Sequence, residues 1–257
     1  MARAERPARL PRATLLAGPS AQHLLGANDV GQDNLSLLLY GARVSLLVGA
    51  LVGICSTAIA WLAGLSSGLS RRADWLVTFA ADLLLAVPGL LLILLIVTYL
   101  GADLVMLIAA LSLASWGAFA RVLRGLVQAE LRKPYVESAR AMGASALRIA
   151  VCHIAPATLP TVAVKFVLTV QYAVVVQASL AFLGLGDATT ISWGGIAHRA
   201  ALSPEVFLGR AWLWWLLPPA LAVAALVLGF ALIGWAIEER RLAGPVRRAA
   251  AWLGSST

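Results

Sequence analysis

Five long apolar runs dominate this 257-residue chain and constrain its fold more than any other feature. Each run has about the 20 residues that a helix needs to cross a bilayer. With 61% hydrophobic and only 12% charged residues, the chain has too little polar surface to cover a water-soluble globule. We therefore expect an all-α integral membrane protein with about five transmembrane helices, since helices satisfy their own backbone hydrogen bonds in lipid. The runs lie at about residues 43–69, 75–100, 102–121, 161–185 and 212–237.

Proline and glycine mark special points inside these runs. Pro88 interrupts the second run, and Pro218 stands near the start of the fifth, so we expect a kink at the first and a kink or a helix start at the second. Gly53 and Gly64 in the first run are small enough to let a neighbouring helix approach closely.

The most polar long segment, residues 135–160, has the signals of a helix, a turn and a second helix. Pro134 precedes a run of helix formers, Gly143 stands where that run should stop, Ser145 opens the next run, and Pro156 is expected to end it. A segment of this kind between membrane spans is suited to press a small face against another protein. Its recurring apolar side chains are Ala139, Met142, Leu147, Ala150 and Val151.

The basic residues predict how the chain is oriented. The net charge of +8 does not indicate nucleic acid, because the basic residues flank apolar runs and form no patch interleaved with aromatic residues. By the positive-inside rule they belong in the cytoplasm, which places the connection at 101–103 and the loop 187–210 outside. The cytoplasmic set is Arg71, Arg72, Arg121, Arg124, Arg132, Lys133, Arg140, Arg148, Arg240, Arg241, Arg247 and Arg248.

The sequence contains no complete set of residues for catalysis. No GxxxxGK[ST] phosphate-binding loop occurs, and HExxH and CxxC are also absent. One GxSxG string occurs, at residues 64–68, but it lies within the first apolar run rather than at a strand-to-helix turn. We therefore expect a transport subunit that is not an enzyme, with no metal site and no cofactor of its own. Cys55 lies in an apolar run and Cys152 in the polar segment, so no disulfide is expected between them.

The polar segment resembles the EAA loop of bacterial ABC importer permeases. Glu137-Ser138-Ala139, then Gly143, then Ile154-Ala155-Pro156 follow the spacing of that motif, with Ser138 in place of its first Ala and Ala155 in place of its usual Leu. The resemblance implies a cytoplasmic coupling loop, at about residues 123–160, that docks into an ATPase subunit. The residues expected to serve this coupling are Tyr135, Glu137, Ser138, Ala139, Gly143, His153 and Pro156, with His153 acting as a packing residue.

Two further segments resemble the dipeptide, oligopeptide and nickel branch of these permeases. The first is the pattern His23-x-Leu25-Gly26, Gly31-x-Asp33, Ser36 and residues 41–46, which precedes the conserved spans. The second is the ending of the fourth run, residues 179–186, followed by Ser192-Trp193-Gly194. The resemblance implies a multi-pass permease subunit in the bacterial cytoplasmic (inner) membrane. Its implied partners are a second permease subunit, two ATP-binding subunits carrying ATP and Mg, an extracytoplasmic substrate-binding protein and membrane lipid.

Di- or oligopeptides are the first expectation for the substrate, because no cluster of His or Cys favours a bare metal. A nickel or metallophore permease of the same family is the alternative. Two other classes also stay open. A secondary transporter would need a charged midplane site and usually an internal repeat, and a non-transporting membrane scaffold would need only the spans. Whether the permease pairs with a copy of itself or with a different subunit is left open.

Two polar residues inside the runs are candidates for the translocation path. Asp82 would cost about 2.5–3.5 kcal/mol as an ionised group at mid-bilayer, so it is expected to pair with a neighbouring span or, as the alternative, to face the substrate path. Gln177 stands where family members commonly have Glu, which removes a charge but keeps hydrogen-bonding atoms. We expect it to form a hydrogen bond between helices.

The expected domain organisation has three parts. Residues 1–22 form an irregular basic tail, 23–237 the permease transmembrane domain, and 238–257 a cytoplasmic C-terminal tail. Related permeases usually have a further span ahead of the His-x-Leu-Gly segment, and residues 1–22 do not supply it. Either this span has been lost or the start of the sequence has been placed too late.

Overall fold

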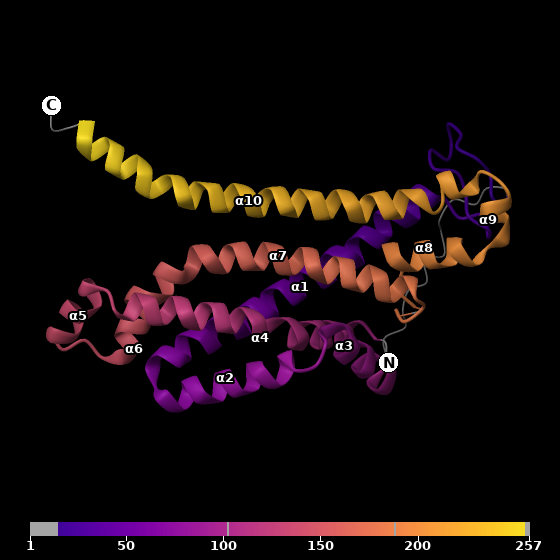
Figure 1. The fold of residues 1–257 in the computed structure, drawn as a ribbon. Helices are drawn as coiled ribbons and strands as arrows, with labels where there is room; N and C mark the ends of the chain where they lie inside the picture. The colour runs from indigo at the N-terminus through magenta and orange to yellow at the C-terminus, as the bar shows by residue number, and fades with distance from the viewer. Residues whose placement is uncertain (1–14, 102, 188, 255–257) are drawn as a thin grey trace. The chain divides into compact units, whose positions relative to one another are not determined.

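The computed structural model describes residues 15–101, 103–187 and 189–254, with side chains up to residue 239. Helices make up nearly all of the regular structure in these residues, and one isolated antiparallel bridge joins Ala27 to Asp33 (Figure 1). The predicted all-α fold is confirmed.

Four helical segments in the described part of the chain are long and apolar enough to cross a membrane, and a bent pair brings the number to five. The prediction of about five spans therefore agrees with the structure. The spanning helices are α1 (Asn34–Leu69), the pair α2 (Arg71–Leu85) and α3 (Gly89–Leu100), α4 (Leu104–Leu131), α7 (Ala155–Phe182) and α10 (Leu217–Gly254).

The second span is broken at the predicted proline. Helices α2 and α3 meet at an angle of 81° across residues 86–88. Pro88 has no backbone N–H to continue the helix, and its ring disfavours helical backbone at the preceding residue. The expected kink is therefore confirmed and is sharp enough to separate two helices. The helix start expected near Pro218 is also present, because Pro218 lies in the first turn of α10.

The described residues divide into two compact units. In the first, residues 15–48, 103–104 and 174–227, a buried cluster includes Leu37, Trp193 and Trp215. The Trp193 Nε1 atom donates a 2.9 Å hydrogen bond to the carbonyl oxygen of Leu38. This unit contains α8 (Trp193–Leu202), α9 (Pro204–Leu208) and the short 3₁₀ helix η2 (Ala211–Leu213).

In the second unit, residues 49–101, 105–173 and 228–254, parts of α1, α4 and α7 pack around a cluster that includes Trp116 and Leu123. Small residues allow close packing as expected. A Cβ atom on Gly53 would lie 2.7 Å from Val170, and one on Gly64 would lie 2.7 Å from Leu123. Two hydrogen bonds link these helices, Trp61 Nε1 to Thr158 Oγ1 at 3.0 Å and Ser115 Oγ to Ser56 Oγ at 2.9 Å.

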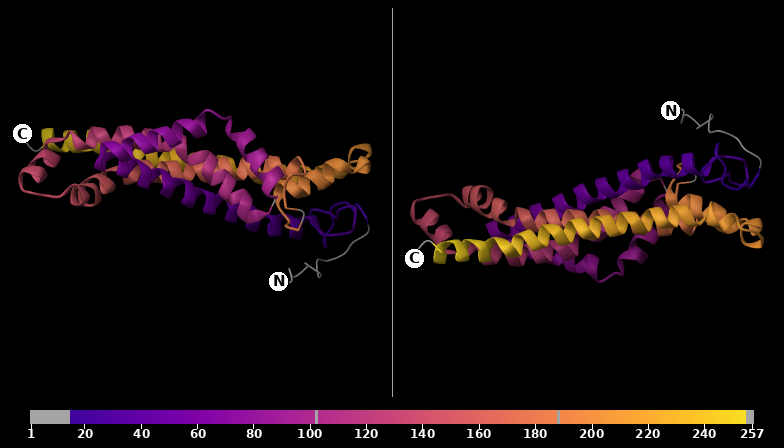
Figure 2. Two further views of the ribbon diagram at one scale, coloured as in Figure 1. Left: turned by 90° about the horizontal axis from the view of Figure 1, so that it is seen from below. Right: turned by 90° about the horizontal axis from the view of Figure 1, so that it is seen from above.

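The segment predicted to be a coupling loop belongs to this second unit. It contains α5 (Pro134–Ala141), α6 (Ala146–Ile149) and the π-helix η1 (Ala150–Ile154). Figures 1 and 2 show α5 and α6 together at the end of the unit where α4 ends and α7 begins.

Candidate functional site: the coupling loop

Helix α5 has a defined start and a defined stop. Pro134 occupies its first turn, where a missing N–H costs nothing, and Glu137 in the same turn complements the helix dipole. At the other end Gly143 has φ +83°, a backbone conformation that favours glycine. The Gly143 N–H bonds the carbonyl of Arg140 at 2.9 Å, and the Ala144 N–H bonds that of Ala139 at 3.0 Å. These two bonds form a Schellman motif, so the predicted turn at Gly143 is present.

The second helix begins as expected but does not end at Pro156. The Ser145 hydroxyl accepts a 3.3 Å hydrogen bond from the Arg148 N–H and so caps α6. The helix then widens into η1, in which the Ala155 N–H bonds the carbonyl of Ala150, five residues earlier. A proline ring inside an α-helix clashes with the carbonyl four residues before it, and the wider turn relieves that clash. The prediction of a stop at Pro156 is therefore wrong.

As a result, the second helix of the loop continues directly into a helix that is long enough to span a membrane. Residues Ala146–Phe182 form one helical segment of 37 residues that is long and apolar enough to cross a membrane. The second helix of the loop is thus the first part of a spanning helix, and Pro156 lies inside it.

The inner face of the loop is an apolar core. Val136 and Ala139 of α5 pack with Ile149, Ile154 and Val127 of α4, and all of them are buried. Ala139 is therefore a packing residue, as its small size suggests. This core fixes α5 against the end of α4.

The outer face of the loop keeps large apolar side chains exposed. Met142 is 82% exposed, Leu147 64% and Val151 58%. Glu137 and Ser138 are also exposed, and the Ser138 hydroxyl donates to the carbonyl of Pro134 at 3.0 Å. Apolar groups gathered on an outer face are typical of a surface that meets another protein.

A buried carboxylate at the end of α4 holds the loop in place. Glu130 is 8% exposed and accepts hydrogen bonds from Lys133 Nζ at 2.6 Å and Tyr135 Oη at 2.7 Å. Burial, that hydrogen bond and the charge of Glu130 raise the pKa of Tyr135 to about 12, so its hydroxyl stays a neutral donor near pH 7. The Tyr135 ring stacks on the His153 ring with 6.1 Å between centroids.

Glu130 and Lys133 lie within the predicted loop but were not among the residues expected to serve coupling. The signal for them was present, because opposite charges three residues apart at a helix end commonly pair. Their importance comes from burial and from the contact with Tyr135, which the spacing alone does not reveal.

The two polar candidates within the spans have different surroundings. Asp82 pairs with Arg121 of α4, which agrees with the expected pairing to a neighbouring span. Gln177 is 3% exposed, and its side-chain oxygen is buried with no hydrogen-bond partner among the described residues. The hydrogen bond expected between helices is therefore not made through that oxygen. Lys165 of α7 lies with its Nζ 5.4 Å from the Phe119 ring centroid.

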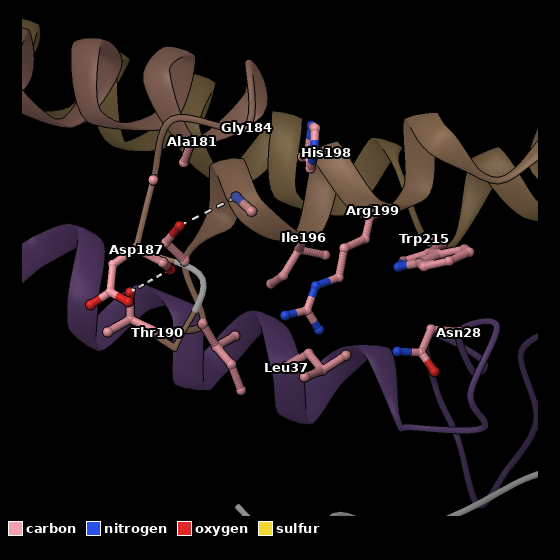
Figure 3. Close-up of a pocket in the computed structure, with 14 residues that line it drawn as sticks. Asn28, Leu37, Ala181, Gly184, Asp187, Thr190, Ile196, His198, Arg199 and Trp215 are labelled. Carbon is pink, nitrogen blue, oxygen red and sulfur yellow. Dashed lines mark hydrogen bonds between the residues drawn. The ribbon is translucent and has the colours of Figure 1, made fainter. Parts of the chain in front are cut away.

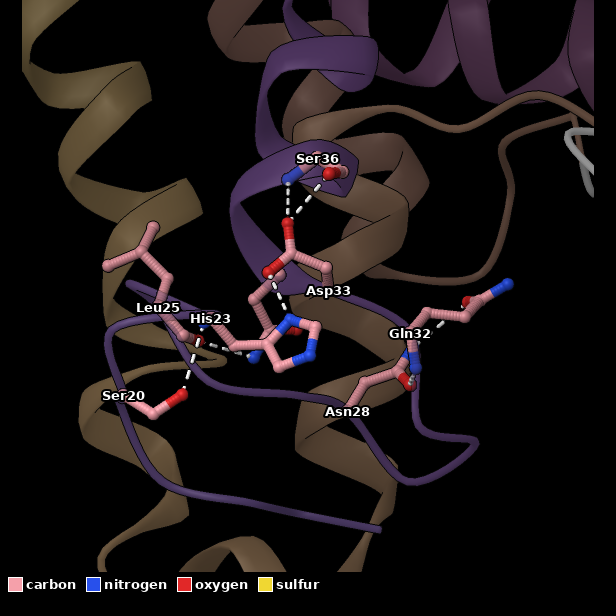
Figure 4. A network of polar contacts seen from close by, with 8 residues as sticks. Ser20, His23, Leu25, Asn28, Gln32, Asp33 and Ser36 are labelled. Carbon is pink, nitrogen blue, oxygen red and sulfur yellow. Dashed lines mark hydrogen bonds and ion pairs between the residues drawn. The ribbon is translucent and has the colours of Figure 1, made fainter. Parts of the chain in front are cut away.

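The segment before α1 is held by a polar network (Figure 4). The His23 Nδ1 atom lies 3.0 Å from Asp33 Oδ1, and Asp33 Oδ2 accepts from the backbone N–H and the hydroxyl of Ser36 at 2.8 and 2.6 Å. Burial raises the pKa of Asp33, but the hydrogen bonds from Ser36 and His23 outweigh this effect and leave the pKa below its usual value. The residues of the His-x-Leu-Gly pattern thus cap and fix the start of α1.

The fold resembles that of one chain of a solved ABC transporter. The structure superposes on the methionine ABC transporter MetNI, solved in an inward-facing conformation, with a TM-score of 0.57 and 17% sequence identity. The match covers 79% of this chain and 97% of that chain, and it concerns the fold.

The sequence comparisons then establish the family. The family described as "Binding-protein-dependent transport system inner membrane component" matches residues 56–240, and this chain belongs to it. The protein is therefore an inner-membrane permease subunit of an ABC importer. It is 36% identical to the di/tripeptide transport system permease protein DppC of Pseudomonas aeruginosa, over 87% of this chain and 73% of the relative. It is 34% identical to the glutathione transport system permease protein GsiD of Pectobacterium atrosepticum, over 86% of this chain and 73% of that relative.

Proposed function

We propose that this permease subunit imports di- or oligopeptides and that ATP hydrolysis on separate subunits drives the import. The substrate class rests on the names of the relatives, since one is a di/tripeptide permease and the other a permease for glutathione, itself a tripeptide. Both names favour a peptide over nickel or a metallophore. Specificity in this proposal is shared with an extracytoplasmic substrate-binding protein.

The proposed assembly contains a second permease subunit and two ATP-binding subunits that hold ATP and Mg. The coupling loop would contact one ATP-binding subunit through its outer face. The exposed side chains of Met142, Leu147 and Val151 support this role, because each would lose water-exposed apolar area on docking. The basic residues beside the loop support a cytoplasmic position, where ATP is available.

The proposed mechanism is mechanical. ATP binding can favour one conformation only through contacts that differ between the two states. Movement of the docked loop would pass to α4 through Glu130 and the apolar core, and to α7 through the continuous helix Ala146–Phe182. That continuity is the observation on which the proposal chiefly rests, because it leaves no flexible joint between docking face and span.

We propose a role in coupling for each of the predicted loop residues. Gly143 makes the turn, Glu137 and Ser138 belong to the docking side of α5, and Ala139 packs the inner face. The Tyr135–His153 stack joins α5 to η1. Pro156 lies where the loop becomes the span.

For the translocation path we propose Gln177 and, at the α2–α4 contact, Asp82. The buried side-chain oxygen of Gln177 has no partner among the described residues and is an available acceptor for a peptide N–H group. We also propose the domain boundaries 1–22, 23–237 and 238–257. Residues 1–14 lie outside the described residues, and α10 continues past residue 237 to Gly254.

Reversing the charge at Glu137 tests the docking role. We expect Glu137→Lys to reduce by at least tenfold the amount of ATPase subunit that co-purifies with the permease, because it places a like-sign charge beside Arg140 and opposes the helix dipole. The measurement is the ratio of the two subunits after affinity purification.

Glu205→Lys is the matched control. Glu205 also lies in the first turn of a short helix that begins with proline, α9, but in the loop predicted to face the outside. Its substitution should leave the subunit ratio within twofold of wild type. Equal recovery of the ATPase with Glu137→Lys and wild type would refute the docking role.

A further inference from the structure

The first compact unit contains a pocket of about 180 Å³ between the segment before α1, the loop after α7, and α8 (Figure 3). Binding sites for whole small molecules usually measure about 300–1,000 Å³. At roughly 30 Å³ for each water molecule, this volume has room for about six. It therefore suits a single side chain better than a complete peptide.

One cation points into this pocket. Figure 3 shows the guanidinium group of Arg199 extending from α8 toward Leu37 of α1. Leu37, Ile196 and Trp215 are 3%, 6% and 1% exposed, so the walls beside the guanidinium are largely apolar. A charge beside apolar walls interacts more strongly with a partner than it would in open water.

Several other polar side chains of the pocket already make hydrogen bonds within the chain. Asp187 Oδ1 accepts from the backbone N–H and the hydroxyl of Thr189, at 2.8 and 2.6 Å. Asn28 Oδ1 accepts from the Gln32 N–H at 2.7 Å, and His198 Nδ1 lies 2.7 Å from the carbonyl oxygen of Phe182. Within the described residues no ion pair joins Arg199 to a carboxylate. Its planar donors are therefore free for an incoming group.

Packing of helix α8 fixes the backbone from which the exposed Arg199 side chain extends. Ser192 caps the helix by accepting from the Gly195 N–H at 3.2 Å, and Trp193 is bonded to the Leu38 carbonyl. A Cβ atom on Gly194 would lie only 2.2 Å from the carbonyl oxygen of Ala178, so helix and span are in close contact.

We propose that this pocket receives an Asp or Glu side chain of the extracytoplasmic substrate-binding protein and that Arg199 binds its carboxylate. A guanidinium group matches a carboxylate with two parallel hydrogen bonds, which a lysine cannot reproduce. The loop 187–210 faces the side from which a binding protein arrives, in the orientation given above. This inference rests on the proposed function and adds the residue and the chemistry of the docking contact.

The test uses the complete importer in nanodiscs and the purified binding protein that is encoded with it. The readout is the binding-protein concentration that half-maximally stimulates ATPase activity, with and without peptide. We expect Arg199→Glu to raise this concentration at least tenfold and Arg199→Lys to raise it about threefold, in both peptide-loaded and peptide-free protein. A charge-reversed variant of the binding protein, Asp or Glu to Arg on its docking face, should restore stimulation of the Arg199→Glu importer.

Arg210→Glu is the control, because Arg210 is exposed in the same loop but does not line the pocket. A change within twofold for Arg199→Glu, or equal changes for both variants, would overturn the pocket assignment. An effect confined to peptide-loaded protein would assign the carboxylate to the substrate and also overturn it. If the wild-type importer showed no stimulation at all, the proposed function itself would fail.

Discussion

Gly143→Val is expected to lower peptide uptake at least tenfold while the permease remains in the membrane at normal amounts. Gly143 has φ +83°, and a β-branched residue is a severe outlier there. Strain of this kind costs roughly 1–3 kcal/mol. Because about 1.4 kcal/mol is a factor of ten in an equilibrium, the turn that presents α5 should be largely lost. Uptake of a labelled dipeptide by cells, normalised to permease in membranes, measures the effect.

Gly143→Asn separates backbone strain from the loss of glycine as such. Asn adopts left-handed backbone more readily than Val, and no atom lies within 4 Å of a Cβ placed at this position. We expect uptake within threefold of wild type for this variant. Normal uptake with Val, or equal loss with Val and Asn, would show that the turn geometry is not what coupling requires.

Asp74→Asn is expected to destabilise the permease markedly, since it leaves Arg124 of α4 without its carboxylate. Asp74 of α2 is bound by two guanidinium nitrogens, with Nη2 at 2.6 Å from Oδ2. The two side chains are 21% and 33% exposed. We expect a loss of roughly 1–3 kcal/mol, below the cost of breaking a fully buried pair. The midpoint of thermal unfolding in detergent should fall by several degrees, and less protein should accumulate in membranes.

The exchanged pair Asp74→Arg with Arg124→Asp provides the decisive comparison. If the contact itself stabilises the α2–α4 packing, the midpoint of thermal unfolding of the double variant should recover at least half of the fall seen with Asp74→Asn. Asp29→Asn, at an exposed residue before α1, should leave the midpoint unchanged. A single variant as stable as wild type would show that the pair contributes nothing.

Much of this fold could be predicted from sequence because lipid imposes a simple rule. Apolar runs of sufficient length must become helices, and Pro88 must interrupt one of them. The loop signals at Gly143 and Ser145 were also reliable, since a left-handed turn and a helix cap are local properties of a few residues.

The errors arose where distant contacts decide the result. The local sequence around Pro156 predicts the end of a helix. The helix nevertheless continues past Pro156, because the π-helical turn before it and the surrounding span accommodate the proline. The role of Glu130 in holding the loop could not be predicted, because it depends on burial and on the contact between its carboxylate and Tyr135. The hydrogen bond expected from Gln177 to another helix is not made through its side-chain oxygen among the described residues. The sequence could not show this, because hydrogen bonding inside a bundle depends on how each helix is rotated. The Arg199 pocket combines segments far apart in the chain, so no local pattern indicates it.

The side of the membrane on which the coupling loop lies can be measured directly with a single cysteine. Cys55 and Cys152 are free and would first be replaced by Ser, and then Met142→Cys, at a position 82% exposed, would be introduced. A membrane-impermeant maleimide should leave this cysteine unlabelled in intact spheroplasts and label it after permeabilisation. Leu208→Cys, at a position 87% exposed in α9, should show the opposite by reacting in intact spheroplasts. Labelling of Met142→Cys from outside would contradict a loop that receives force from a cytoplasmic ATPase.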